Sequence, residues 1–396
     1  MQNWLWATAA DLGRGIERGE IDPINLCETY LNAIDGHKLR DRIYACVTHD
    51  RARTEAKAAS ARAKVGQRLS PLDGVPVSWK DLFDTAGVAT EAGTKLMEGR
   101  VPTQDAERRF LVGRHPVRQQ VFAFGLAAAA VGSDTGGSVR IPSVWNDLVG
   151  LKTTFGRLPL DGSVALCSQF DTVGPLCRSV EDAGLMLAAL EGRKVDDLAG
   201  TSLKGLRFGA LQSVVLDDVS TASMAGYTAA IEKLKAAGAA IVPVKVSALE
   251  RAFEMSLPLY TADAYANWRD LVEADPNKMF HQILERVSGG KNVLAHDYLA
   301  LWDELRDIRE AYAQATAEFD AVLCPGAANM PPNLERLASD TEYYQRENLL
   351  TLRNTRVANL MGLGIIGAAN GHSICWDFGE RGSGKRCAPI AHRGGC

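Results

Sequence analysis

Hydrophobic positions recur at helical and strand spacing along most of the chain. Leu12 and Ile16 follow a capping pair, Thr8 and Asp11, which predicts a short helix, and Asp22-Pro23 predicts the start of a second one. The later predicted elements are a helix at 52–64, a strand at 74–81, a helix at 179–190, a strand at 206–211, a helix at 221–237, a strand at 239–246, a long helix at 296–319 and a strand at 321–324. Strands that alternate with helices predict an α/β fold around a mostly parallel or mixed sheet.

The apolar run 126–131 fits either a buried helix or a buried strand, and the pattern alone does not separate the two. No internal repeat or low-complexity linker divides the chain up to residue 363. We therefore expect one domain over residues 1–363.

Composition and charge narrow the function classes. The chain has 396 residues, of which 46% are hydrophobic and 23% charged, with a formal net charge of −4. A mildly acidic balance gives no electrostatic argument for nucleic acid or an anionic membrane as partner. No apolar run reaches the roughly 20 residues that span a bilayer, and the first residues lack the basic segment of a signal peptide. We expect a cytoplasmic protein.

Cysteine and histidine positions give no sign of a metal site. The eight cysteines form no CxxC pair, and the seven histidines show no helix-face spacing. We predict neither a metal nor a cofactor. Five cysteines lie among apolar neighbours and are interpreted as small buried hydrophobic residues: Cys27, Cys46, Cys167, Cys177 and Cys324.

A glycine-rich run, Gly132 to Ser138, is the strongest candidate for chemistry. Glycines allow successive backbone N–H groups to point toward one place, which is what an oxyanion hole requires. A serine at the end of such a run can attack the carbonyl group held there. A tight turn with a capping serine is the plain alternative. A phosphate-binding loop fits less well, because the run contains Asp134 and lacks a Gly-Lys-Ser/Thr ending.

A serine hydroxyl needs a base, and no histidine neighbours the glycine-rich run or a predicted strand end. Lys80 lies at the end of the apolar segment 74–81. If this lysine is buried, loss of hydration disfavours its ammonium form, so that the neutral amine can accept a proton. The alternative is an ordinary solvated lysine.

Taken together, these segments resemble those of the amidase signature hydrolases. Gly74–Asp81 with Thr90–Thr94 resembles the lysine segment of that family, and Gly132–Arg140, continuing through 141–143 and 149–157, resembles its nucleophile segment. Residues 170–178 and 354–360 resemble two later stretches. The resemblance implies an amidase-signature α/β/α sandwich with a mixed central β-sheet flanked by helices.

The resemblance also implies a Ser–Ser–Lys triad that cleaves carbon–nitrogen bonds through an acyl-enzyme. It assigns Lys80 as base, Ser138 as nucleophile and the backbone of Thr135, Gly136, Gly137 and Ser138 as oxyanion hole. The expected substrate is a small-molecule amide. The family includes the A subunit of the glutamyl-tRNA(Gln)/aspartyl-tRNA(Asn) amidotransferase, so a homodimer and a complex with amidotransferase partner subunits are both open.

The bridging serine of that triad has no counterpart in this chain. It should lie about two dozen residues before Ser138, yet no serine occurs between Trp79 and Gly132, and the region around 108–125 is shortened. Loss of an acid–base group lowers rates by about 10² to 10⁴. We expect very low activity, unless Ser133 or a water molecule supplies the proton path; a catalytically inactive amidase-like protein is the alternative.

Residues 364–396 depart from the family pattern and show no helical or strand period. Their Arg, Gly and Cys content, like that of Arg108–Gln120, is typical of GC-rich coding sequence read out of frame; a basic tail that binds a partner is the alternative. We predict an aberrant or disordered tail at 364–396 and, less strongly, no regular structure at 108–120. An unpaired sheet edge would then lower expression and weaken the cooperativity of melting.

Overall fold

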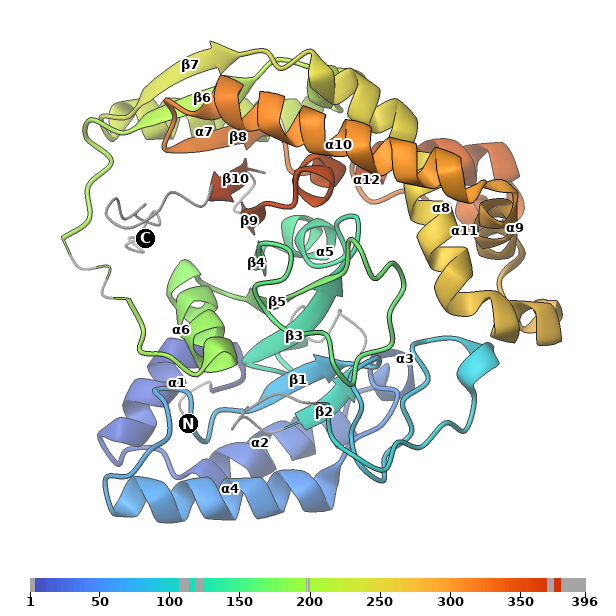
Figure 1. Ribbon diagram of the computed structural model, residues 1–396. Helices are drawn as coiled ribbons and strands as arrows, with labels where there is room; N and C mark the ends of the chain where they lie inside the picture. Colours follow the sequence, from blue (N-terminus) through green and yellow to red (C-terminus); the bar gives the residue numbers. More distant parts are fainter. Residues whose placement is uncertain are drawn as a thin grey trace.

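One mixed β-sheet runs through the molecule, as the ribbon in Figure 1 shows. The computed structural model describes residues 4–106, 114–117, 124–196, 198, 200–368 and 374–378. In these ranges the sheet has ten strands in the order β2-β1-β3-β5-β4-β9-β10-β8-β6-β7. The strands are β1 (Val77–Lys80), β2 (Arg114–Val117), β3 (Ala129–Asp134), β4 (Val149–Lys152), β5 (Thr172–Cys177), β6 (Arg207–Leu211), β7 (Ala240–Val244), β8 (Ala321–Cys324), β9 (Gly364–Ala368) and β10 (Ile374–Phe378).

Parallel pairs form the two ends of the sheet, and antiparallel pairs form its middle. β1 pairs in parallel with both β2 and β3, and β6 pairs in parallel with β7 and β8. Between these groups, β5, β4, β9 and β10 pair antiparallel with their neighbours. The apolar run that sequence left undecided thus ends in strand β3, whose residues are all buried.

Helices cover both faces of this sheet. The helices are α1 (Ala9–Glu17), α2 (Pro23–Asp35), α3 (Arg40–Ile43), α4 (His49–Lys64), α5 (Arg140–Trp145), α6 (Val180–Glu191), α7 (Thr221–Ala236), α8 (Ala248–Ala274), α9 (His281–Gly289), α10 (Ala295–Thr316), α11 (Leu334–Ser339) and α12 (Thr341–Met361). Side chains of α1, α2 and α6 share a core with β1, β3 and β5. Those of α8, α10 and α12 pack with β8, while α7 packs on β6 and β8 in a separate cluster. The predicted α/β/α arrangement with a mixed central sheet is confirmed.

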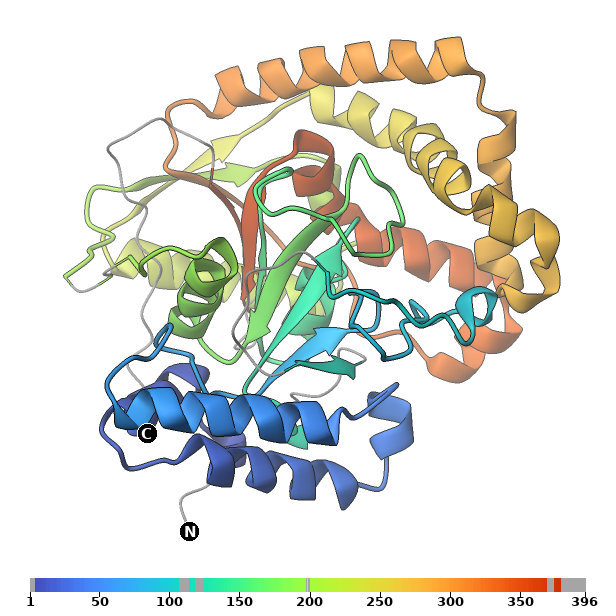
Figure 2. The same ribbon diagram turned by 60° about the horizontal axis from the view of Figure 1, so that its bottom comes forward.

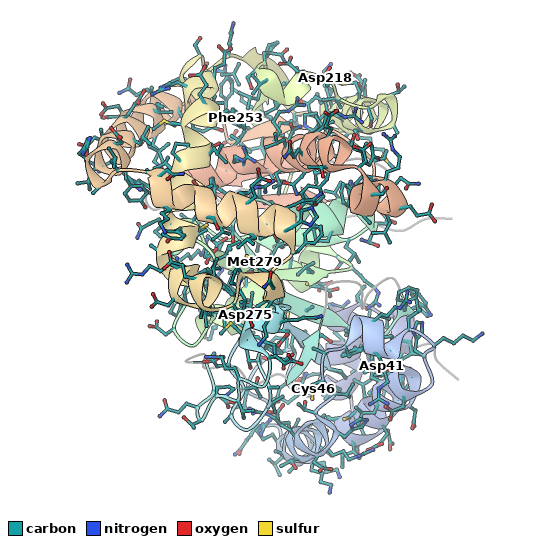
Figure 3. The ribbon with its side chains drawn as sticks, turned by 90° about the vertical axis from the view of Figure 1, so that its right-hand side faces the viewer. Asp41, Cys46, Asp218, Phe253, Asp275 and Met279 are labelled. Atoms are coloured by element: carbon teal, nitrogen blue, oxygen red, sulfur yellow. The ribbon has the colours of Figure 1, made fainter. Side chains whose placement is uncertain are left out.

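The two ends of the sheet carry different sets of helices. Turning the molecule brings α2 and α4 to the front, where they lie side by side (Figure 2). In the side view, Phe253 of α8 lies in the upper half, whereas Asp41 and Cys46 lie in the lower half (Figure 3). None of the helices in the described ranges has the length and apolar character needed to cross a bilayer.

Helix starts follow the caps that the sequence predicts. Thr8 accepts a hydrogen bond from the N–H of Asp11 at the start of α1, and Asp22 caps α2 with Pro23 in its first turn. Ser179 accepts from the N–H of Asp182 at the start of α6. Each cap satisfies an N–H group that the first helical turn leaves unpaired.

Two expectations about regular structure are wrong. Residues 364–368 form β9, which pairs with β4 on one side and β10 on the other, and residues 374–378 form β10. A short strand inside a sheet is held by backbone hydrogen bonds on both edges and is covered on both faces, so it needs no alternating pattern. Residues 369–373 and 379–396 lie outside the described residues.

The second correction concerns the stretch 108–120. Arg114–Val117 forms β2, which pairs in parallel with β1 at the edge of the sheet. Pro116 is compatible with this position because an edge strand has one side free of ladder hydrogen bonds. The remaining residues of the stretch, 108–113 and 118–120, lie outside the described residues.

Candidate active site

Strands β1 and β3 bring a lysine and a serine together at one end of the sheet. Lys80 is the last residue of β1, and Ser133 lies near the end of the neighbouring parallel strand β3. The Nζ atom of Lys80 donates a hydrogen bond to Oγ of Ser133 at 2.9 Å. Because parallel neighbours end at the same edge of a sheet, the strand pairing itself sets this contact.

Burial makes the ammonium form of Lys80 less favourable than it is in water. Burial lowers the pKa of Lys80, and the negative charges of Asp171 and Asp134 oppose the shift without reversing it. A neutral amine has a free electron pair and can take a proton from a hydroxyl group. The lysine is therefore suited to act as a base toward Ser133.

The turn after β3 presents backbone N–H groups. Residues 135–139 connect β3 to α5, and Gly137 has a φ of +138°, a region that side chains disfavour. The N–H groups of Gly136 and Gly137 donate to no acceptor among the described residues. The carbonyl of Gly136 accepts a hydrogen bond from Oγ1 of Thr355 in α12 at 2.6 Å. This contact fixes the peptide plane that follows Gly136.

Asp171 forms a further contact with the turn, through the side chain of Thr135. Its carboxylate accepts a short hydrogen bond from the Thr135 hydroxyl and two more from the N–H groups of Leu166 and Cys167, at 2.7 and 3.0 Å. Burial nevertheless raises the pKa of Asp171 to about 6, because these hydrogen bonds offset only part of the lost hydration. The carboxylate therefore links the glycine-rich turn to the loop before β5.

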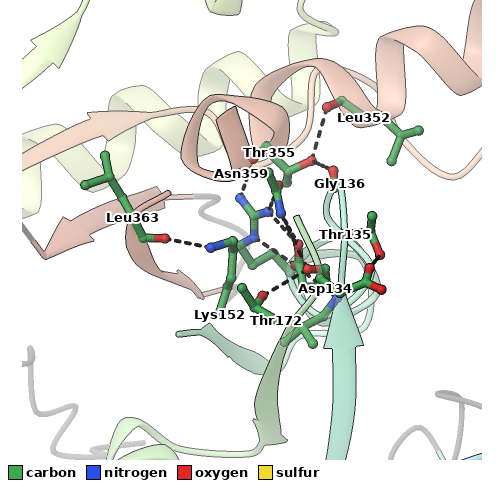
Figure 4. A network of polar contacts seen from close by, with 12 residues as sticks. Asp134, Thr135, Gly136, Lys152, Thr172, Leu352, Thr355, Asn359 and Leu363 are labelled. Carbon is green, nitrogen blue, oxygen red and sulfur yellow. Dashed lines mark hydrogen bonds and ion pairs between the residues drawn. The ribbon is translucent and has the colours of Figure 1, made fainter. Parts of the chain in front are cut away.

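A buried ion pair lies beneath the turn (Figure 4). Arg140 donates from Nε and Nη2 to the two carboxylate oxygens of Asp134 at 3.0 and 2.8 Å, and both side chains are fully buried. Asn359 of α12 donates to the same carboxylate at 3.0 Å. Burial would raise the pKa of Asp134, but the charge and hydrogen bonds of Arg140 hold it well below its usual range. The pair ties β3, α5 and α12 into one unit.

Lys152 is also fully buried, close to this network. Its Nζ donates to the carbonyl oxygens of Leu363 and Thr153 at 2.7 and 3.0 Å (Figure 4). This lysine joins the end of β4 to the residue before β9. It satisfies backbone carbonyls of the fold, which distinguishes it from Lys80.

Some of the predicted site residues come together and others remain predictions. Lys80 contacts Ser133 of β3, which is five residues before Ser138 in the sequence. The approach of Lys80 to Ser138 itself, and the roles of Ser138 and the oxyanion loop, stay predictions. The described ranges contain no group of three or more His, Cys, Asp or Glu side chains that could hold a metal ion.

Sequence reasoning gave no role to the residues that support the turn. These residues lie in the stretches that resemble the amidases: Arg140, Asp171, Thr355 and Asn359. Their spacing in the sequence does not show which of these side chains contact one another. Asp134 and Asn359 are 225 residues apart. One feature of the sequence could have indicated the ion pair. Asp134 and Arg140 are oppositely charged and follow an apolar run, and a charged side chain buried beside such a run needs a partner of opposite charge.

Comparison with known proteins identifies the family. A family model described as Amidase matches residues 25–109 and 120–374, which leaves a gap inside the stretch 108–120. This chain belongs to the amidase family. An amidase of Pseudomonas putida is 30% identical over 368 residues, covering 80% of this chain and 78% of that protein. The 2-amino-5-chloromuconic acid deaminase of Comamonas testosteroni is 29% identical over 401 residues, covering 88% and 85%. Both matches extend over at least 78% of either protein.

Another relative is one component of a larger enzyme. The A subunit of the glutamyl-tRNA(Gln) amidotransferase of Anaeromyxobacter dehalogenans (strain 2CP-C) is 34% identical over 292 residues. The match covers 60% of this chain and 59% of that relative. Identity at this level extends over little more than half of either protein.

Solved structures of amidases share the fold. A structure titled "Crystal structure of amidase" has a TM-score of 0.78 at 24% identity, covering 94% of this chain and 96% of the other. An inhibitor-bound structure from work on the origins of an s-triazine catabolic enzyme has a TM-score of 0.82 at 21% identity, covering 94% of each chain. The amidase fold thus extends over nearly the whole chain.

Proposed function

We propose that this chain hydrolyses amide bonds through an acyl-enzyme on Ser138, with Lys80 as base and Ser133 as the group between them. The observation that carries the proposal is the 2.9 Å hydrogen bond from the Lys80 amine to Ser133 Oγ, next to the glycine-rich turn. Ser133 then takes the part of the bridging serine that this sequence lacks. The downward shift of the Lys80 pKa on burial supports the assignment.

The proton path in this scheme consists of two transfers. Ser138 Oγ attacks the amide carbon, its proton passes to Ser133 Oγ, and the Ser133 proton passes to the Lys80 amine. The backbone N–H groups of Gly136 and Gly137 support the negative oxygen of the tetrahedral intermediate. When the C–N bond breaks, the proton returns along the same path to the leaving nitrogen. Water then attacks the ester on Ser138 and releases the acid.

Hydrolysis of an aliphatic amide and an aryl amide tests the proposal. We expect turnover below that of amidases with a bridging serine, complete loss in Ser138→Ala, and a further fall of about 10² to 10⁴ in Ser133→Ala. Ser247→Ala is the matched control, because that hydroxyl is exposed and makes no capping hydrogen bond. Equal rates for wild type and Ser133→Ala would reject the relay. A folded wild type without turnover would instead indicate a non-catalytic protein on an amidase scaffold.

A second candidate is the A subunit of a tRNA-dependent glutamine amidotransferase. The identity with the Anaeromyxobacter relative favours it. In that role the chain would release ammonia from glutamine only in a complex with partner subunits. Co-purification of a tRNA-binding subunit, together with glutaminase activity that depends on it, separates this candidate from a free-standing amidase.

A further inference from the structure

A threonine of α12 contacts the turn after β3 through its hydroxyl group (Figure 4). Thr355 is fully buried, and its Oγ1 lies 2.6 Å from the carbonyl oxygen of Gly136. A second acceptor, the carbonyl oxygen of Leu352 in the same helix, is 3.2 Å from Oγ1. Because a hydroxyl group has a single hydrogen, the shorter contact indicates that this hydrogen is donated to the turn.

This hydrogen bond determines which way the next N–H group points. The peptide bond between Gly136 and Gly137 is trans, so its C=O and its N–H point in opposite directions. With the carbonyl directed at Thr355, the N–H of Gly137 points away from α12. Gly137 is buried, and its N–H donates to no acceptor among the described residues. Buried N–H groups of this kind are rare in folded proteins, and this one is available to a ligand.

The following peptide plane is held in a different way. The carbonyl of Gly137 accepts a hydrogen bond from the N–H of Ile141 in α5 at 2.8 Å, which is a contact between backbone groups. The plane between Gly136 and Gly137 is held instead by a side-chain hydroxyl. Both residues that flank this plane are glycines, which rotate at little steric cost. Without the hydroxyl of Thr355, this plane is therefore able to turn over and direct its N–H toward α12.

We propose that Thr355 is a positioning residue for amide hydrolysis, whose hydroxyl keeps the Gly137 N–H directed toward the developing oxyanion. It acts through the Gly136 carbonyl and not by contact with the substrate. This inference rests on the acyl-enzyme mechanism proposed above. The backbone carbonyl of Thr355 also accepts a hydrogen bond from Arg140 at 2.6 Å, and a change of the side chain leaves that contact in place. Loss of the hydroxyl should therefore affect the turn more than the packing of α12.

Two substitutions separate the hydroxyl from the shape of the side chain. Thr355→Val keeps the shape and removes the hydroxyl, whereas Thr355→Ser keeps the hydroxyl and removes a methyl group. For hydrolysis of an aliphatic amide we expect Thr355→Val to lower kcat about 10- to 100-fold with KM within about twofold, because the oxyanion forms only in the transition state. Thr355→Ser should retain most of the wild-type kcat.

Thr316→Val is the matched control for the loss of a threonine hydroxyl. That hydroxyl donates to the carbonyl of Tyr312 within α10, and we expect its removal to leave kcat unchanged. A purely structural role of Thr355 would lower the melting temperature and leave kcat per folded molecule unchanged. If circular dichroism shows that Thr355→Val does not fold, Thr355→Ala takes its place, with the same expected loss of kcat.

Binding of phenylboronic acid gives a second readout that does not need turnover. In the expected adduct a bond forms between boron and Ser138 Oγ, the O–H bond of the serine breaks, and its proton passes through Ser133 to the Lys80 amine. The product is a tetrahedral boronate anion beside the turn. Isothermal titration should show about 10- to 100-fold weaker binding to Thr355→Val than to the wild type, and little change in Thr355→Ser.

The outcomes distinguish this inference from the proposed function. If the wild type hydrolyses amides and Thr355→Val keeps its kcat per folded molecule, Thr355 is not a positioning residue and the proposed function stands. Equal losses in Thr355→Val and Thr355→Ser overturn the inference in the same way, because the hydroxyl is then not the group that matters. Boronate binding that depends on the hydroxyl, without amide hydrolysis, supports the positioning role and rejects the proposed activity. A wild type that shows neither hydrolysis nor boronate binding rejects both.

Discussion

Neighbouring glycines in the turn after β3 have different structural requirements. Gly137 has a positive φ, and a Cβ atom there would overlap Thr355 Oγ1 and Ile141 Cδ1. The nearest atom to a Cβ on Gly136 is Leu352 Cδ2, at 3.8 Å, which is an ordinary contact. The turn therefore depends on one glycine for its shape, and on Thr355 and Asp171 for its position.

Alanine substitutions at these two glycines should differ sharply. Gly137→Ala is expected to abolish amide hydrolysis and to lower the free energy of unfolding by roughly 2–4 kcal/mol, from backbone strain and the clash with Thr355. Gly136→Ala should change stability by less than about 1 kcal/mol. Urea unfolding and hydrolysis rates measure both. Equal effects of the two substitutions would show that the turn does not have this shape.

Asp171 should make stability depend on pH in one direction. Its pKa is raised to about 6, so its contribution to stability is complete below about pH 4 and is lost as the pH rises through 6. From pH 4.5 to 7.5 the wild type should lose about 2 kcal/mol relative to Asp171→Asn, which cannot titrate. Urea unfolding of both proteins at the two pH values measures this difference. Parallel pH profiles would mean that Asp171 is ionised at both pH values.

Among the individual elements, strand β9 joins the two halves of the sheet. It pairs with β4 on one edge and with β10 on the other, and Lys152 of β4 binds the carbonyl of Leu363 directly before it. Residues from both halves of the sequence therefore meet at β4 and β9. Removing this strand would leave two unpaired edges inside the sheet.

Truncation at two positions tests the role of this strand. A chain ending at residue 363 lacks β9 and β10 and should aggregate or melt at a much lower temperature. A chain ending at residue 378 keeps both strands, and we expect it to melt like the full chain, because residues 379–396 show no helical or strand period. Size-exclusion chromatography and thermal melts compare the three proteins. A stable, monomeric chain ending at 363 would contradict the prediction.

The whole molecule is built around one sheet with separate cores at its two ends. Side chains of α1, α2 and α6 form one core, and those of α8, α10 and α12 form another. The antiparallel middle strands connect the two, and Ile366 of β9 packs against the first core while Ile365 belongs to the second. Contact of both cores with the same strand couples their stabilities.

This coupling changes the expectation for melting. The sequence predicted weak cooperativity from a missing strand, whereas the paired β9 leads us to expect one unfolding transition for the described fold. Near-ultraviolet and far-ultraviolet circular dichroism should then give the same midpoint, and calorimetry a single peak. Two separated peaks would show that the cores unfold independently.

The sequence by itself determined the local elements and the family. Caps such as Thr8 and Ser179, the helical periods and the apolar strands depend on near neighbours in the chain, so their physics is visible in the order of residues. The glycine-rich run and Lys80 carried the resemblance to amidases for the same reason. Helix α8, which contains Pro258, was not among the elements predicted from the sequence.

Only the tertiary structure decided which distant groups meet. It placed Ser133 at the Lys80 amine, Asn359 at the Asp134–Arg140 pair and Gly364–Ala368 between two other strands. The Lys80–Ser133 hydrogen bond joins residues 53 positions apart, and the Asn359–Asp134 contact and the pairing of β9 with β4 join residues much farther apart, so all three depend on strand order and helix packing. A hydrogen bond or a strand pairing between residues so far apart produces no periodic pattern in the sequence. The identity of one partner does not restrict which residues lie next to the other partner.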